Sequence, residues 1–355
     1  MKKLIPIITL ASIIFTAHAQ FTAGDLAVVR VGDGSTTLAN SAGPISLLDV
    51  TTGGSIQHTA NISSGNGGLQ ISGTATSEGQ LILNSDNQSF TVAGYVPPFT
   101  GNNSLSGRTS TQAPRGYATV SLNGTVSSTT TLTGNYSGQN IRSGFVSGTG
   151  AWFSGSGTSA GSGIVYYNGT ATTIQGVNSR VLGYYGGNLF YSISSATAGI
   201  SGIYKYSGLP TVATTATSFL TGVTGQGTSP YDFVFSPDGS TLYVADDGIG
   251  VQKFSLISGS WVFDYNFTDG LTGNRAYGLA VDFSGVNPLV YWTSPANVWA
   301  AVDAGSAAVG TSILSAGSNY AFRGLEIVPT PEPSTLALAG LGMAALVAFR
   351  RNRKA

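Results

Sequence analysis

The sequence predicts an all-β protein, and three observations support this. Short runs rich in β-branched and aromatic residues recur along most of the 355 residues, bounded by Gly, Asn, Asp or Pro. The chain has 50 glycines, about twice the average usage, and only 8% charged residues. No stretch of residues 20–328 shows helical periodicity. Many short strands joined by small-residue turns give this profile, and a hydrophobic content of 41% argues against disorder.

A repeated pair of strands is visible in the second half of the chain. The expected strands cover residues 26–31, 81–83, 118–122, 164–167, 189–193, 233–235, 242–244, 279–283 and 289–292. The clearest copy of the repeat, residues 230–246, is a strand, a Ser-Pro-Asp-Gly turn and a second strand. Pro at the second turn position and Gly at the fourth suit a type I turn. Residues 276–285 and 289–292 form a second copy.

The repeat resembles those of lactonase-like and related seven-bladed β-propellers. Weaker copies begin at Arg115, Arg142 and Arg180. The spacings from Arg142 to Arg180, Tyr231, Arg275 and Arg323 are 38, 51, 44 and 48 residues, which match a four-stranded blade. The last copy, residues 322–328, has one strand, which residues 26–31 and 45–50 could complete. This count predicts seven blades. Residues 34–176 hide the period, so a β-helix-like N-terminal half is the alternative.

The first 19 residues have the order of a secretory signal peptide. Lys2 and Lys3 are followed by an apolar run over residues 4–15 and then by Ala-His-Ala at 17–19. We therefore expect signal peptidase to release a chain that begins at Gln20.

The last 27 residues combine a proline-rich segment, an apolar segment and a basic end. Pro331, Glu332, Pro333 and Ser334 belong to the extended segment that begins at Pro329. Residues 335–349 are apolar and uncharged, but 15 residues is short of the roughly 20 that a spanning helix needs. Basic residues stop such a segment in the membrane, and here they are Arg350, Arg351, Arg353 and Lys354.

This tail resembles the PEP-CTERM sorting signal. The resemblance implies cleavage by an exosortase near the Pro-Glu-Pro motif, in a Gram-negative host that makes exopolysaccharide. It divides the chain into a signal peptide at 1–19, a propeller-like body at 20–328 and a sorting tail at 329–355. The precursor would be retained in the inner membrane through the apolar helix and then released to the outer membrane, cell surface or extracellular matrix. A plain single-pass anchor is the alternative.

Composition excludes several kinds of site. The body has nine basic and 14 acidic residues, a net charge of −5, and nucleic-acid-binding proteins show the opposite balance. The chain has no cysteine, and its body has one histidine, His58, so thiolate chemistry and His-rich metal sites are disfavoured.

Arginine precedes a first strand in five copies of the repeat. These residues are Arg115, Arg142, Arg180, Arg275 and Arg323. Because the first strand of each blade lines the central channel, we expect the five arginines to meet at one mouth of that channel. A basic ring there would favour anionic ligands such as uronate sugars. The alternative is that each arginine only braces neighbouring blades.

Asp246 and Asp247 follow the second strand of the best copy. Carboxylate oxygens suit Ca²⁺, although such a pair more often caps a turn. We predict no cofactor, and the Ca²⁺ site is the weaker interpretation of this pair.

The sequence favours a non-enzymatic surface or matrix protein that binds exopolysaccharide or another envelope component. The alternative is a propeller enzyme, either a lactonase-like hydrolase or a polysaccharide lyase. Convergent carboxylates around a metal, or a His/Tyr/Arg cluster in a cleft, would favour the enzyme. A channel of Arg, Gly and hydrophobic residues would favour binding.

Overall fold

The computed structural model describes residues 21–64, 68–101, 104–195, 199–271 and 273–330. These residues form 26 β-strands and contain no helix. The described part of the chain accordingly holds no helix of the length and apolarity that a membrane crossing requires. The predicted signal peptide, the apolar segment 335–349 and the basic end lie outside the described residues.

The strands form six antiparallel four-stranded units, which we call blades and give from the inner strand outwards. Blade 1 contains β26 (Ala321–Ile327), β1 (Leu26–Val31), β2 (Ala42–Val50) and β3 (Ile56–Asn61). Blade 2 contains β5 (Leu81–Leu83), β6 (Ser89–Tyr95), β7 (Arg115–Ser121) and β8 (Thr130–Leu132). Blade 3 contains β9 (Ile141–Ser147), β10 (Gly150–Gly155), β11 (Ile164–Tyr167) and β12 (Ala171–Gln175).

The remaining blades follow the same order. Blade 4 contains β13 (Leu182–Tyr185), β14 (Asn188–Ile193), β15 (Gly202–Lys205) and β16 (Thr217–Thr221). Blade 5 contains β17 (Pro230–Phe235), β18 (Thr241–Asp246), β19 (Gly250–Ile257) and β20 (Ser260–Thr268). Blade 6 contains β21 (Leu279–Asp282), β22 (Leu289–Thr293), β23 (Asn297–Val302) and β25 (Thr311–Ser315). Two short strands are additional: β4 (Gln70–Ser72) joins blades 1 and 2 into one sheet, and β24 (Ala308–Val309) pairs with β20.

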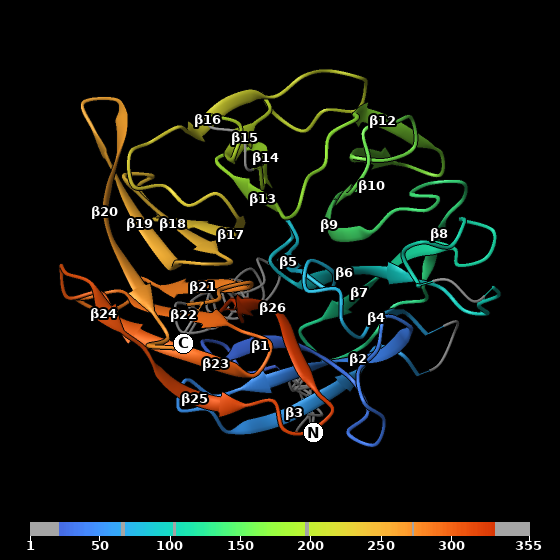
Figure 1. Ribbon diagram of the computed structural model, residues 1–355, viewed down its shortest axis with the longest axis horizontal. Coiled ribbons are helices and arrows are strands. Elements are labelled where there is room, and N and C mark those ends of the chain that lie inside the picture. Colours follow the sequence, from blue (N-terminus) through green and yellow to red (C-terminus); the bar gives the residue numbers. More distant parts are fainter. Residues whose placement is uncertain (1–20, 65–67, 102–103, 196–198, 272, 331–355) are drawn as a thin grey trace, which may run out of the picture.

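The six inner strands form a closed ring. Each inner strand contacts the next in the order β26, β5, β9, β13, β17 and β21, and β21 contacts β26 again. Figure 1 shows the blades radiating from this ring, with β3, β8, β12, β16, β20 and β25 at the periphery. The chain is therefore a β-propeller, and its described strands form six blades.

The prediction of seven blades is wrong in its count. Arg115 lies on β7, the third strand of blade 2, and does not mark the start of a blade. The spacing of 27 positions from Arg115 to Arg142 is also shorter than the repeat length. The β-helix alternative is wrong as well, because the described strands of the N-terminal half pair antiparallel within blades 1 to 3.

The repeat predicted at residues 230–246 is the hairpin of β17 and β18. Gly239 N–H donates to the Ser236 carbonyl at 2.9 Å and closes the predicted turn. Gly239 has a φ of 72°, a region that favours glycine. The Asp238 carboxylate accepts from Ser236 Oγ at 2.6 Å, which fixes the turn before β18 begins. Local turn chemistry thus sets the register of the two strands.

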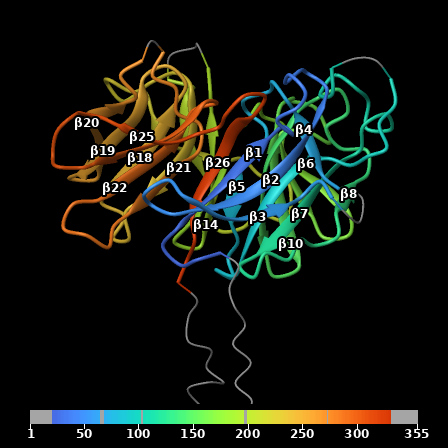
Figure 2. The same cartoon turned by 90° about the horizontal axis from the view of Figure 1, so that it is seen from below.

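Blade 1 joins the two ends of the described chain, as predicted. β26 pairs antiparallel with β1, and β1 pairs with β2. Val328 extends the pairing, because its carbonyl accepts from Gly24 N–H at 2.9 Å and its N–H donates to the Asp25 carbonyl at 2.8 Å. Figure 2 shows β26 and β1 crossing the thickness of the ring side by side. This pairing closes the propeller.

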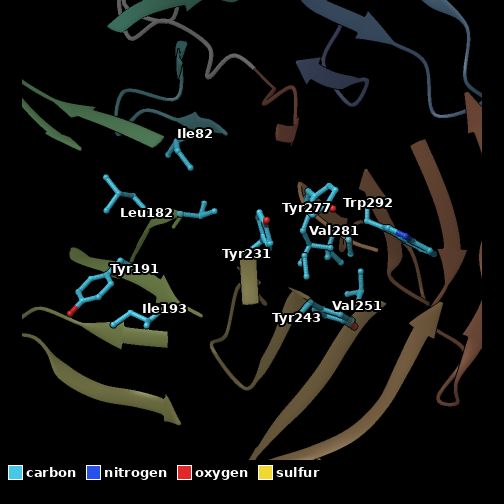
Figure 3. Packing of buried hydrophobic residues seen from close by; sticks show 14 of the residues in the cluster. Ile82, Leu182, Tyr191, Ile193, Tyr231, Tyr243, Val251, Tyr277, Val281 and Trp292 are labelled. Carbon is cyan, nitrogen blue, oxygen red and sulfur yellow. The ribbon is translucent and has the colours of Figure 1, made fainter. Parts of the chain in front are cut away.

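Glycines allow the inner strands to approach each other closely. A Cβ at Gly278 would lie 2.6 Å from the backbone nitrogen of Leu325, and one at Gly324 would collide with the backbone nitrogen of Leu81. The glycines that follow the arginines in the repeat therefore have a packing role. Around this ring the core is apolar, and Figure 3 shows Tyr231 and Tyr277 in its middle.

Candidate functional site

Four of the predicted arginines surround Tyr231 at one end of the channel. Arg142 is on β9 and Arg323 on β26, and Arg180 and Arg275 lie shortly before β13 and β21. The Arg180 guanidinium lies 4.1 Å from the centroid of the Tyr231 ring. Tyr231 also interacts electrostatically with Arg142, Arg275 and Arg323, which places it near all three. We call this end of the channel, defined by the four arginines and Tyr231, the arginine mouth.

Arg115 and Arg323 are buried and bind backbone carbonyls. Arg115 donates from Nη1 to Arg108 O and Ala113 O, and from Nη2 to Ser106 O and Gln139 O, at 2.7–2.9 Å. Arg323 donates to Phe322 O at 2.9 Å and to Gly73 O at 2.8 Å. Burial lowers the pKa of Arg323 to about 10. Both side chains hold loops and strands together from inside the fold, and Arg115 lies in blade 2 rather than before an inner strand.

Arg142 and Arg180 are half-buried neighbours with the same charge. Arg142 Nη1 donates to Asn178 Oδ1 at 2.7 Å and to the Ser179 carbonyl at 2.6 Å. Arg180 Nη1 donates to Ser229 Oγ at 3.0 Å. Burial lowers the pKa of Arg142 to about 10, and the charge of Arg180 contributes in the same direction. Within the described ranges, neither arginine has a carboxylate within ion-pair distance.

Arg275 is the most open of the five, with its side chain 57% exposed. Its Nε lies 3.8 Å from Asp247 Oδ1, and its Nη1 lies 3.4 Å from the Tyr277 hydroxyl. These are long contacts, so most of the hydrogen-bonding capacity of this guanidinium faces solvent.

Asp246 and Asp247 accept hydrogen bonds from the segments that precede β17 and β21. Asp246 is buried, and its Oδ2 accepts from Ser229 N–H at 2.8 Å. Burial raises the pKa of Asp246 to about 6, although this hydrogen bond opposes the effect. Asp247 Oδ1 accepts from the Tyr277 hydroxyl at 3.1 Å. Nowhere in the described part of the chain do three or more His, Cys, Asp or Glu side chains gather as metal ligands. The Ca²⁺ site stays a prediction.

Glu78 is a buried hydrogen-bonding centre that sequence reasoning missed. Its Oε1 accepts from the Tyr95 hydroxyl and from Asn140 Nδ2, both at 2.6 Å, and its Oε2 accepts from Ser72 N–H at 2.8 Å. Burial raises the pKa of Glu78, and these three donors and the charge of Arg323 oppose the rise. Its sequence neighbours, Ser, Thr and Gly, gave no pattern that could have revealed it.

A cavity of about 280 Å³ occupies the other half of the channel, where the inner strands end. Its lining comes from β5, β13, β17, β21 and β26. It contains two acidic residues, Asp232 and Glu326, that sequence reasoning did not select. Each lies within a short run of apolar strand residues. An acidic residue inside such a run is the signal that could have revealed it.

Both cavity carboxyls accept a backbone N–H from a neighbouring blade. Asp232 Oδ2 accepts from Leu279 N–H at 3.0 Å, and Glu326 Oε1 accepts from Leu83 N–H at 3.1 Å. Burial raises the pKa of Asp232 to about 8. Burial, and next the charge of Asp232, raise the pKa of Glu326 well above its ordinary value. One end of the channel therefore holds basic side chains, and the other end holds two acidic ones.

Several solved structures are similar to the chain at low identity. A putative 6-phosphogluconolactonase from Bacteroides uniformis ATCC 8492 is 14% identical, with a TM-score of 0.44 and coverage of 84% of this chain and 83% of that one. A functionally unknown protein from Desulfotomaculum acetoxidans DSM 771 is 13% identical, with a TM-score of 0.43 and coverage of 85% and 99%. Hydrazine synthase from Kuenenia stuttgartiensis is 12% identical, with a TM-score of 0.43 and coverage of 82% and 80%. At these scores the propeller is established by the strand pairing of the chain itself.

The C-terminal tail gives the more specific comparison. No curated protein matches the chain. Residues 329–354 match the family model described as the PEP-CTERM protein-sorting motif. The prediction from the Pro-Glu-Pro segment, the apolar segment and the basic end is thus confirmed, although residues 331–355 lie outside the described structure. The chain carries a PEP-CTERM sorting motif, which marks it as an exported, exosortase-processed protein.

Proposed function

We propose that the body is a non-enzymatic binding protein of the cell envelope or extracellular matrix, and that it holds an anionic polysaccharide at the arginine mouth. The observation that carries this proposal is that Arg142 and Arg180 are neighbours of the same charge. Two like charges in a half-buried position repel each other, and in the described structure no carboxylate lies within ion-pair distance of either. Glu78 and Asp246 act on Arg142 and Arg180 only from further away. An anion between them would relieve this repulsion and accept charge-assisted hydrogen bonds.

The arginines have different roles in this proposal. Arg142, Arg180 and Arg275 contact the carboxylates of uronate sugars, because they retain exposed N–H groups. Arg115 and Arg323 position the loops and strands around them through backbone carbonyls. A local positive mouth on a body of net charge −5 would attract a polyanion only at short range, so binding should weaken as salt rises.

Export and sorting precede binding. Signal peptidase removes residues 1–19, and residues 335–349 with the basic end keep the precursor in the inner membrane. Exosortase cuts near Pro331–Ser334, and the body of residues 20–328 passes to the outer membrane, cell surface or matrix, where it meets exopolysaccharide. The sorting motif supports this order.

The test is binding of the full chain, purified in detergent micelles, to polygalacturonate and to neutral dextran. We expect polygalacturonate to bind at low salt and the double variant Arg142→Gln/Arg180→Gln to bind about tenfold more weakly or worse. Lys205→Gln on β15 is the matched control, since it removes a positive charge away from the mouth. Equal binding of dextran, or unchanged binding by the double variant, would contradict the proposal. Release of shortened sugar products would favour the enzyme instead.

A further inference from the structure

The cavity at the end of the channel opposite the arginine mouth has an acidic floor and an aromatic rim. Asp232 and Glu326 lie among its lining residues with Tyr184, Tyr185 and Phe235. Tyr184 stacks on Phe145 with ring centroids 4.9 Å apart, and 41% of Tyr184 is exposed. Tyr185 stacks on Phe235 with centroids 4.5 Å apart. The rings are therefore fixed in place at the rim before any ligand arrives.

The two carboxyls have no cationic partner in the described ranges. Asp232 is 6% exposed and accepts backbone N–H groups from Leu279 and its own neighbour Phe233. Glu326 accepts from Leu83 through Oε1, while its side chain keeps part of its surface open to the cavity. Burying a carboxylate without a cation costs free energy, and this cost falls when a positive charge enters the same space.

We propose that this cavity binds the ammonium group of a small organic cation of the amino-sugar class. When the ammonium group enters, one of the carboxyls of Asp232 and Glu326 releases its proton to solvent and the resulting carboxylate pairs with the ammonium group. The aromatic rim covers the apolar face of the sugar ring. A pair of carboxyls supplies too few ligands for Ca²⁺, which takes six or more oxygens, whereas an ammonium group has three N–H donors. The site is independent of the arginine mouth, because it uses the other end of the channel and a ligand of opposite charge.

The test uses three sugars that differ in charge: glucosamine, glucose and glucuronate. Calorimetric titration of the full chain in detergent micelles should show glucosamine binding, with glucose about tenfold weaker or worse and glucuronate weakest. Glu326→Gln and Asp232→Asn keep the side-chain shape and an acceptor for the backbone N–H, and each should weaken glucosamine binding about tenfold. Asp264→Asn, on β20, is the control that changes net charge equally, and it should leave affinity unchanged.

Further variants separate this site from the proposed function. Tyr184→Ala removes a rim ring at a position that is 41% exposed, and it should weaken glucosamine binding several-fold while the melting temperature shows how far folding is affected. Arg142→Gln/Arg180→Gln should leave glucosamine binding unchanged while polygalacturonate binding falls. Absence of glucosamine binding at millimolar concentration would overturn the proposal. Equal affinity for glucose, or unchanged affinity in both carboxyl variants with their melting temperatures intact, would also overturn it.

Discussion

The two ends of the channel differ in the side chains that they bury and in the backbone groups that bind those side chains. At the arginine mouth, positive side chains donate to carbonyls such as Ser179 O and Gly73 O. At the opposite end, Asp232 and Glu326 accept from the N–H groups of Leu279 and Leu83. One ring of blades therefore binds arginines through loop carbonyls at one end and carboxyl groups through strand N–H groups at the other.

The largest expected effect concerns the acidic end and its dependence on pH. Below about pH 4 the carboxyl of Asp232 is protonated in both the folded and the unfolded state and contributes nothing. As the pH rises, the unfolded carboxyl ionises while the folded one stays protonated until about pH 8, so stability falls over this window. We expect the free energy of unfolding to drop between these pH values by roughly 6 kcal/mol more in the wild type than in Asp232→Asn.

Urea unfolding at a series of pH values measures this difference. Asp264→Asn should follow the wild-type curve, because that acid lies on the outer strand β20. Parallel curves for the wild type and Asp232→Asn would show that the cavity does not disfavour the ionised carboxyl.

The next effect concerns the arginine side of the molecule. Arg115→Met should lower the free energy of unfolding by about 3 kcal/mol, because it leaves buried carbonyls at Arg108, Ala113, Ser106 and Gln139 without their donor. Arg275→Met, at an exposed position, should change it by less than about 0.5 kcal/mol. Urea midpoints compare the two variants. Equal losses of stability in the two variants would mean that the buried arginine contributes no more to stability than the exposed one.

The smallest effect concerns the ring between the two ends. Gly324→Val places side-chain atoms against the backbone of Gln80 and Leu81, and it should lower stability by about 2 kcal/mol. Gly53→Ala is the control, since its new Cβ would meet only a Thr51 side chain at 3.8 Å. Thermal melting checks the pair. A Gly324 variant as stable as the control would show that the inner strands can move apart.

The sequence predicted much of the fold because strand runs and turns are local. The hairpin at 230–246, the closure through residues 26–31 and the sorting tail all depend on neighbouring residues or on chain ends. The blade count failed at Arg115, where an Arg-Gly pair on a third strand imitates the start of a blade. Asp232 and Glu326 were missed because 94 positions separate them, and only closure of the ring brings them into one cavity.

The hydrogen bonds of Val328 have a consequence for the order in which the strands can follow one another along the sequence. Because Val328 exchanges hydrogen bonds with Gly24 and Asp25, a short peptide could join these points without crossing the fold. New ends could then be opened at Val212, which is 69% exposed between β15 and β16. Such a circular permutant would hold every blade-1 strand in continuous sequence, and it would move the seam of the ring from blade 1 to blade 4.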